Sequence, residues 1–318
     1  MRERRYNGGD SMKVYGNNGQ SGLHYYSREL AKILGYEWQD IIPMLRSGKS
    51  MDDGLLVISA GSNWRVIPHS SGCVPFWEYY LAPRIPETTG VRFAASQFIE
   101  HILGGYVLPI IATPVKCSGP NMEEFTVLYS FSSGSCMFRK NPWCLIKACA
   151  MMEPRPKLII KTDCPRPDWL KDEWVEWIGE HLDSEAYDRI WERATVYVST
   201  HRSEGIGMTL VEAMGRGKPI VSTAYGGCVE FLESEFCDLL PYAWTKMPSD
   251  GIHIAYDCIK GICIPEPSVA SLVTLLSRLR DDPSRIESMA AAANHKHMDM
   301  VLDWQWQTPK IIRMAGFP

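Results

Sequence analysis

The feature that most constrains this chain is a regular alternation of short apolar runs with longer segments of helical spacing. Short apolar runs predict buried strands, and the helices between them supply the crossovers that parallel strands need. The pattern starts with MKVYG at 12–16, and the helical segment LHYYSRELAKIL follows at 23–34. We therefore predict an α/β fold with helices packed on a parallel sheet.

The alternation restarts after a polar, turn-rich stretch, GPNMEE at 119–124, which is the predicted linker between two domains. Before it, strands are predicted at 54–61 and 107–115, and a short strand and then a helix starting near Ser96 are predicted within 91–103. After it, the pattern predicts strands over 125–131, 157–163, 195–200 and 219–227, a loop over 132–142, and helices over 143–152, 186–194, 208–217, 268–283 and 284–302.

Two such series predict two doubly wound, Rossmann-like domains with a cleft between them, and ligands in such sheets bind beyond the carboxyl ends of the strands. The expected division is a flexible N-terminus at 1–11, an N-terminal domain at 12–118, a C-terminal domain at 119–295 and a helical tail at 296–318. Packing back on the N-terminal domain is one arrangement open to the tail. HKHMD at 295–299 is expected to be a solvated helix end.

Composition excludes several classes of protein. The formal net charge of −4 gives no overall basic field for nucleic acid. No uninterrupted apolar run approaches the ~20 residues of a membrane span, and the polar N-terminus does not resemble a signal peptide. The ten cysteines are scattered without a CxxC pair, which favours a reducing, cytoplasmic setting and argues against structural zinc.

The stretch HRSEGIGMTLVEAM at 201–214 carries two acids around a glycine break, between a predicted strand and a predicted helix. Gly205 and Gly207 allow a sharp turn and a close approach to a ligand. The free N–H groups and the dipole of a helix start favour a phosphate there. Glu204 and Glu212 can reach different parts of one extended ligand, and carboxylates suit sugar or ribose hydroxyls. Taken alone, two surface glutamates explain this spacing better.

Two other loops carry candidate residues. Arg139 and Lys140 follow a predicted strand, where cations could neutralise a leaving diphosphate, although a solvated basic pair is the better reading of the two residues alone. Glycines at 16, 19 and 22 follow the first strand but do not have the G-x-G-x-x-G spacing, which argues against a bound NAD.

The segment HRSEGIGMTLVEAMGRGKPIVSTAYGG at 201–227 resembles the donor site of glycosyltransferase family 4, retaining enzymes with the GT-B fold, of the bacterial type called group 1. The RKNP at 139–142 resembles the family's diphosphate-binding pair, and GICIPEPSVASL resembles its late C-domain segment. The resemblance implies that Glu204 contacts the donor sugar and Glu212 the nucleotide's ribose. It also implies that the diphosphate of the donor lies near Arg139, Lys140 and the backbone of Gly207, Met208, Thr209 and Leu210.

On the N-terminal side the resemblance is looser. It implies that Gly19, Gln20, Ser21 and Gly22 lie under the diphosphate beside the acceptor, although a plain strand-to-helix turn explains them equally well. It also suggests His69 near the transferred sugar, where a structural histidine is the alternative.

The resemblance implies transfer of a sugar from a UDP or GDP donor to a glycan or other hydroxyl acceptor, with retained configuration. No D-x-D motif is present, so we expect neither a metal nor a cofactor. The alternatives are a sugar-nucleotide epimerase or hydrolase of the same fold, and a non-catalytic nucleotide-sugar-binding protein. Peripheral membrane contact and the oligomeric state are left open.

Overall fold

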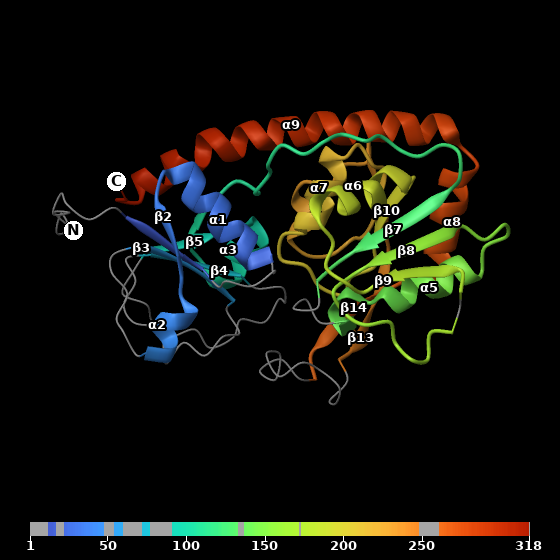
Figure 1. Ribbon diagram of the computed structural model, residues 1–318, viewed down its shortest axis with the longest axis horizontal. Helices are drawn as coiled ribbons and strands as arrows, with labels where there is room; N and C mark the ends of the chain where they lie inside the picture. Colours follow the sequence, from blue (N-terminus) through green and yellow to red (C-terminus); the bar gives the residue numbers. More distant parts are fainter. Residues whose placement is uncertain are drawn as a thin grey trace.

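The computed structural model describes residues 12–16, 22–47, 54–59, 72–76, 91–132, 137–171, 173–247 and 261–317. Two parallel sheets form separate lobes, and one long helix lies across both (Figure 1). The prediction of two doubly wound α/β domains is confirmed.

The N-terminal sheet has the strand order β2-β1-β3-β4-β5-β6, and every neighbouring pair is parallel. Its strands are β1 (Lys13–Gly16), β2 (Glu37–Asp40), β3 (Gly54–Ser59), β4 (Gly72–Phe76), β5 (Val91–Ala94) and β6 (Tyr106–Val107). The helices are α1 (Gly22–Leu34), α2 (Ile42–Ser47) and α3 (Gln97–Leu103). Helix α1 buries Tyr26 and Leu30 against the sheet, as its apolar spacing predicts.

One predicted strand of this lobe is wrong. The apolar run at 107–115 pairs only over Tyr106–Val107, and residues 108–125 continue without regular structure towards the second lobe. Pro109 and Pro114 lack the N–H that a ladder needs, so the run cannot continue as a paired strand. The predicted cap at Ser96 is confirmed, because its hydroxyl accepts from the Ile99 N–H at 3.2 Å.

The C-terminal sheet has the order β12-β11-β10-β7-β8-β9, again with every neighbouring pair parallel. Its strands are β7 (Thr126–Ser130), β8 (Lys157–Lys161), β9 (Val175–Ile178), β10 (Val196–Ser199), β11 (Ile220–Thr223) and β12 (Cys237–Leu240). Helices α5 (Pro142–Ala150), α6 (Ser184–Arg193), α7 (Met208–Gly215) and α8 (Val269–Arg280) accompany it. This is the strand order of Rossmann-type dinucleotide-binding domains. The order reverses between β7 and β10, because β8 and β9 follow on one side of β7 and β11 and β12 follow on the other side of β10.

Several other elements also depart from the sequence prediction. The expected loop at 132–142 contains a short helix, α4 (Met137–Lys140), which leads directly into α5. An antiparallel hairpin of β13 (Tyr242–Lys246) and β14 (Cys263–Pro267) extends from the sheet after β12. The short 3-10 helix η3 (Gly227–Glu230) follows β11.

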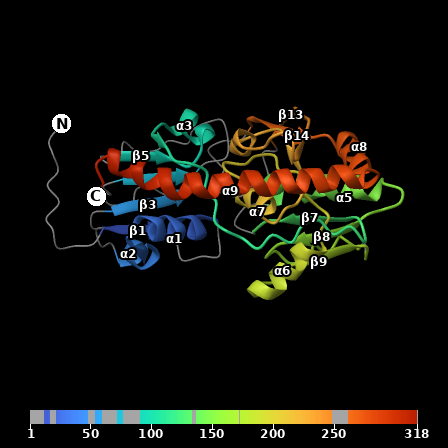
Figure 2. The ribbon, with the colours of Figure 1, turned by 90° about the horizontal axis from the view of Figure 1, so that it is seen from above.

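Helix α9 (Pro283–Met314) joins the two lobes (Figure 2). Met289 and Ala293 belong to the C-terminal core, whereas Trp304 and Ile312 belong to the N-terminal one. The expectation of a solvated helix end at 295–299 is wrong, because this segment is in the interior of α9 and His297 is buried. A Cβ on Gly215 of α7 would lie 2.6 Å from the His297 ring, so the glycine allows the two helices to approach this closely.

The segment between the sheets is held by the C-terminal lobe. The N–H groups of Ser118 and Asn121 donate to the carbonyls of Arg216 and Ala194. The buried ammonium of Lys218 donates to Gly119 and Ala194 carbonyls, and burial lowers its pKa to about 7. Among the described residues, no helix combines the length and apolar character that crossing a bilayer requires.

Candidate active site

Three of the residues expected to bind the sugar donor, Arg139, Lys140 and Glu204, lie where the strand order of the C-terminal sheet reverses. Strands β7 and β10 are hydrogen-bonded neighbours, and the loops that follow them leave the same edge of the sheet. The first loop leads to Arg139 and Lys140, and the second carries Glu204. In open α/β sheets this edge is the usual place for a ligand.

Glu204 is buried and lies against both cations. The Lys140 ammonium donates to Glu204 Oε2, and Arg139 Nη1 lies 3.5 Å from the same oxygen. Arg139 also donates to the Ser203 carbonyl at 2.8 Å. Burial opposes ionisation of Glu204, but the attraction of Lys140 and Arg139 outweighs it and holds the pKa of this carboxyl well below its usual range. Glu204 is therefore an anion between two cations.

Arg202, on the loop that follows β10, is bonded both to the hairpin and to the segment that carries Arg139 and Lys140. Arg202 donates to both carboxylate oxygens of Glu266 on β14, from Nε at 2.5 Å and from Nη2 at 3.1 Å. The same guanidinium donates to the Phe138 carbonyl at 2.7 Å, and its Cζ lies 4.4 Å from the centre of the Phe138 ring. Asn141, in a left-handed conformation with φ 48°, donates to Glu266 at 3.3 Å. The position of Arg139 and Lys140 is thus built from both loops and the hairpin.

His201 is a structural member of this loop. Its Nε2 donates to the Tyr225 carbonyl at 2.9 Å, so its Nδ1 accepts from the Ser199 hydroxyl at 2.9 Å. Burial lowers the pKa of His201 to about 4. The ring is neutral near pH 7. It therefore ties the loop at 200–207, called the donor loop from here on, to β10 without adding charge next to Glu204.

Two glycines permit the tight path of the donor loop. Gly207, the residue before α7, has φ +88°, and a Cβ there would lie 2.8 Å from the Leu210 side chain. Gly226 has φ +93°, and a Cβ there would lie 2.1 Å from the Glu204 carbonyl oxygen. The next residue, Gly227, donates its N–H to that same oxygen at 2.9 Å. The loop after β11 therefore clamps the backbone of Glu204.

Glu212 lies in the second turn of α7, within a hydrogen-bonded group of its own. Its carboxylate accepts from the Tyr187 hydroxyl at 3.0 Å and from Arg216 at 3.2 Å. Arg216 also pairs with Asp188 at 2.5 Å. Burial raises the pKa of Glu212 above its ordinary value, although Arg216 and Tyr187 counteract that effect. The pKa shifts of Glu204 and Glu212 therefore have opposite signs, although the two residues are close in sequence.

The N-terminal lobe touches the donor loop through the start of α3. The Ser96 hydroxyl donates to the Gly205 carbonyl at 2.9 Å while it caps α3. The carboxylate of Glu230 in η3 accepts from the N–H groups of Gln97 and Phe98 at 2.9 and 2.5 Å. A negative charge at a helix N-terminus is stabilising, so these bonds hold the lobes together beside Glu204.

Ser96→Ala is expected to raise the donor KM and to lower the free energy of unfolding. Loss of the cap should cost about 0.5–2 kcal/mol of unfolding free energy. Ser268→Ala is the matched control, because the Ser268 hydroxyl caps a different helix, α8, by accepting from the Ser271 N–H at 3.2 Å. Both variants should lose similar stability in urea unfolding, but only Ser96→Ala should raise the donor KM. Equal KM values for the two variants would show that the Ser96–Gly205 bond has no part in the site.

The remaining predicted residues divide into two groups. Met208, Thr209 and Leu210 form the first turn of α7, beside Glu204, and Gly22 begins α1. Gly19, Gln20, Ser21 and His69 lie outside the described residues.

Sequence reasoning did not identify Ser96 as a contact of the donor loop, nor Glu266 or Tyr187 as site residues. A signal exists for Glu266, because it lies within GICIPEPSVASL, the stretch that resembles the family's late C-domain segment. Tyr187 had none beyond its place in a helical pattern.

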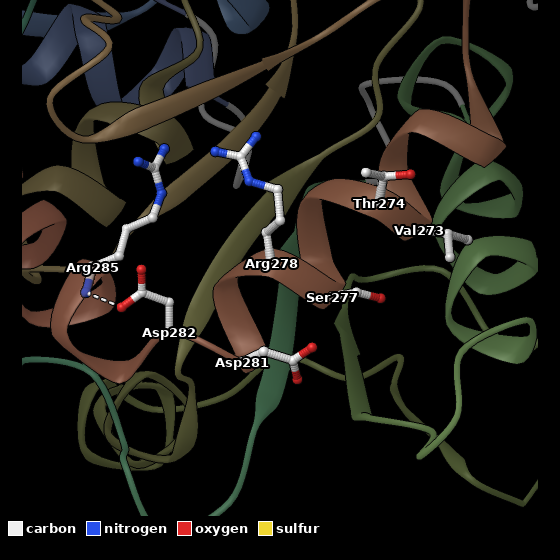
Figure 3. A pocket seen from close by; sticks show the side chains of 7 residues that line it. All are labelled: Val273, Thr274, Ser277, Arg278, Asp281, Asp282 and Arg285. Atoms are coloured by element: carbon white, nitrogen blue, oxygen red, sulfur yellow. Dashed lines mark hydrogen bonds between the residues drawn. The ribbon is translucent and has the colours of Figure 1, made fainter.

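A separate hollow of about 630 Å³ lies at the junction of α8 and α9 (Figure 3). It is lined by Val273, Thr274, Ser277, Arg278, Asp281, Asp282 and Arg285, none of which is an expected site residue. Within the described ranges, no group of three or more His, Cys, Asp or Glu side chains is placed to hold a metal.

Comparison with protein families gives a match over the C-terminal lobe. The family described as "Glycosyl transferases group 1" matches residues 130–243, which include Arg139, Lys140, Glu204 and Glu212 but not Glu266. Sucrose synthase from Melioribacter roseus is 39% identical over 64 residues, which are 19% of this chain and 8% of that protein. Sucrose synthase from Denitrovibrio acetiphilus is 38% identical over 63 residues and is again matched over 8% of its length.

Solved structures match over nearly the whole chain. Anabaena HepE, in complex with UDP and glucose, has a TM-score of 0.65 at 12% identity, over 97% of this chain and 100% of that one. The lipopolysaccharide outer core galactosyltransferase WaaB, in its apo form, has a TM-score of 0.61 at 12% identity, over 96% and 99%. At such identities the likeness shows the fold alone. The chain therefore has the two-domain GT-B fold, and its residues 130–243 match the group 1 glycosyl transferases.

Proposed function

We propose that this protein is a retaining glycosyltransferase that moves a sugar from a UDP or GDP donor to a hydroxyl of a glycan or other acceptor. One observation carries the proposal: the buried Glu204 carboxylate lies between Arg139 and Lys140 at the strand-order reversal of a domain matched by group 1 glycosyl transferases. A buried anion with two cations is a costly arrangement for stability alone, which favours a functional role.

In this proposal the donor lies across the C-terminal lobe. Glu204 contacts the sugar, and Glu212 accepts the ribose hydroxyls. The diphosphate lies between the cations of Arg139 and Lys140 and the backbone at the start of α7, at Gly207, Met208, Thr209 and Leu210. Gly19, Gln20, Ser21 and Gly22 would line the acceptor side, and His69 would lie near the transferred sugar.

The acceptor oxygen forms the new bond to C1 of the sugar, and the bond from C1 to the phosphate oxygen breaks. The departing diphosphate takes the electron pair, and its oxygen can take the acceptor's proton, as front-face attack requires. The two cations and the helix dipole stabilise the negative charge that develops there. This supply of positive charge supports a reaction that needs no metal and no cofactor.

The solved relatives favour a uridine nucleotide. Besides HepE, the pneumococcal O-GlcNAc transferase GtfA was solved in complex with UDP and GlcNAc, and it has a TM-score of 0.53 at 15% identity. We also expect a reducing, cytoplasmic setting, because the eight cysteines among the described residues are free thiols.

The function is tested by thermal unfolding with UDP-, GDP- and ADP-sugars in the presence of EDTA. A donor at about 100 times its Kd stabilises a protein by about 2.7 kcal/mol, so the correct nucleotide should stand out. Glu212→Ala should weaken donor binding by about 10–100-fold, because it removes a charged hydrogen-bond acceptor. Glu185→Ala is the control, since Glu185 is exposed in α6.

The pH dependence of donor binding gives a second test of the same residue. Because the Glu212 pKa is raised, this carboxylate takes up a proton at a higher pH than an ordinary glutamate as the pH falls. As the pH falls, donor affinity of the wild type should therefore begin to decrease at a higher pH than an ordinary glutamate would cause, and Glu212→Gln should remove that dependence. Unchanged donor binding in Glu212→Ala would refute the site. Turnover of the donor without any acceptor would instead favour an epimerase or hydrolase, and binding without turnover a non-catalytic protein.

A further inference from the structure

Tyr25 on helix α1 reaches out of the N-terminal lobe towards the C-terminal one. The first turn of α1 points to the second lobe (Figures 1 and 2), and Tyr25 is 43% exposed, whereas the next residue, Tyr26, is buried in the N-terminal core. The Tyr25 hydroxyl is hydrogen-bonded to the Thr113 hydroxyl, on the segment between the two sheets. Tyr25 therefore presents its polar group outside the core of its own lobe.

Thr113 is held beside the helix that carries Glu212. The His297 ring is hydrogen-bonded to the Thr113 backbone. The same ring packs on α7, because a Cβ on Gly215 would lie 2.6 Å from it. Gly215 follows Glu212 by three residues, so the two are neighbours on the surface of α7. The bond from Tyr25 to Thr113 therefore joins the N-terminal lobe to a segment that packs close to Glu212.

The electrostatics of Tyr25 agree with this placement. Burial raises the pKa of Tyr25; the bond to Thr113 opposes this effect, and the negative charges of Glu29 and Glu212 raise the pKa further. Glu29 lies one turn along the same helix, whereas Glu212 belongs to the other lobe. The Tyr25 phenol is therefore within electrostatic reach of Glu212 and keeps its proton near neutral pH, so it can donate a hydrogen bond there.

A pair of neighbouring hydroxyls bound to Glu212 would need such a group. The Glu212 carboxylate accepts from Tyr187 at 3.0 Å and from Arg216 at 3.2 Å. A carboxylate has about four acceptor positions, so the two protein donors leave positions for the hydroxyls of a ribose. Hydroxyls that donate their protons to Glu212 still have lone pairs that can accept, and the protonated phenol of Tyr25 is suited to meet one of them.

We propose that Tyr25 is the contact of the N-terminal lobe to the ribose of the sugar donor, with its hydroxyl donating to a ribose oxygen that is also bonded to Glu212. The inference rests on the proposed function, in which Glu212 accepts the ribose hydroxyls. The bond to Thr113 can persist, because the Thr113 hydroxyl can donate to the Tyr25 oxygen and leave the phenol proton for the ligand. The nucleoside end of the donor then joins the two lobes, and Tyr25 selects a ribonucleotide over a deoxyribonucleotide.

The experiment measures, by calorimetry on the full chain, the binding of UDP and GDP and of the 2′-deoxy and 3′-deoxy forms of each. Tyr25→Phe removes only the hydroxyl and should weaken binding of the preferred ribonucleotide by about 3–10-fold, the effect of one hydrogen bond. Its affinity for one of the two deoxy analogues should equal that of the wild type, because that analogue lacks the oxygen that Tyr25 binds. Tyr106→Phe is the matched control, since Tyr106 is 52% exposed on β6 of the same lobe.

Thr113→Val separates the contact to the ligand from the bond between the lobes. It removes the partner of the Tyr25 hydroxyl but keeps the phenol, so it should discriminate between the ribonucleotide and its deoxy analogues as the wild type does. Two results for Tyr25→Phe would overturn the inference and leave the proposed function intact. One is unchanged affinity for the ribonucleotide, and the other is an equal loss for the ribonucleotide and both deoxy analogues, which would identify a purely structural bond. A wild type that binds neither UDP nor GDP would overturn the proposed function, and this inference with it.

Discussion

Lys140→Met is expected to lower sugar transfer, or donor hydrolysis, by about 10²–10³-fold, the usual cost of losing one group that stabilises developing negative charge. Methionine keeps an unbranched side chain of nearly the same length but removes the ammonium that lies against Glu204. The loss should appear in kcat, because the charge on the diphosphate grows as the bond to C1 breaks. Lys147→Met is the matched control, since Lys147 is an exposed residue of α5.

A double-mutant cycle separates the two roles that Lys140 could have. If Lys140 acts on the diphosphate, Lys140→Met should slow the Glu204→Gln enzyme by about the same factor as it slows the wild type. If Lys140 only neutralises Glu204, it should have no further effect once the carboxylate is gone. Equal rates for Glu204→Gln and the double variant would therefore contradict the assignment.

For the free energy of unfolding, in contrast to the rates, the effects of Lys140→Met and Glu204→Gln should depend on each other. Removing one partner of a buried pair costs about 3–5 kcal/mol, and the nearby Arg139 should keep the loss at the lower end. The pKa of Glu204 is depressed, so its pairing stabilises the protein above the ordinary carboxyl pKa, and this stabilisation is lost as pH falls through the folded value. The destabilisation by Lys140→Met should accordingly shrink at acid pH in urea unfolding, and Glu204→Gln should relieve it at neutral pH.

The sequence could predict those parts of the fold that depend on local patterns. The central strands β7, β8, β10 and β11 are short apolar runs, so their order along the chain can be read from the sequence. The same holds for Arg139, Lys140 and Glu204, because each follows such a strand. Neighbouring parallel strands end at the same edge of a sheet. Residues that directly follow such strands therefore lie close together in space.

The missed elements lack those local signals. The edge strands β2 and β9, EWQD and VEWI, are half polar, and β4, GCVPF, contains a proline that argues against a strand. Their pairing is set by the neighbouring strand and not by their own composition. The bonds from Ser96 to Gly205 and from Arg202 to Glu266 join residues far apart in sequence, so no periodicity could reveal them.

Gly226→Ala is expected to reduce turnover by about 10²-fold or more, although the residue adds no group to the site. A Cβ at this position would lie 2.1 Å from the Glu204 carbonyl oxygen, a backbone atom that cannot rotate away. The donor loop must therefore shift, and a displacement of about 1 Å at a positioned group can cost a factor of this size. The donor KM should rise and kcat should fall, because Glu204 and the start of α7 move together.

The strain of a positive φ must be separated from this clash, and Gly35 allows it. Gly35 has φ +70° and Gly226 φ +93°, but a Cβ on Gly35 would meet no atom within 4 Å. Gly35→Ala should lose only the backbone term, about 1–2 kcal/mol of unfolding free energy, with unchanged kinetics. Gly226→Ala should lose more stability and also activity. Wild-type turnover in Gly226→Ala would mean that the Glu204 backbone can move without consequence, and the catalytic position assigned to Glu204 would then be untenable.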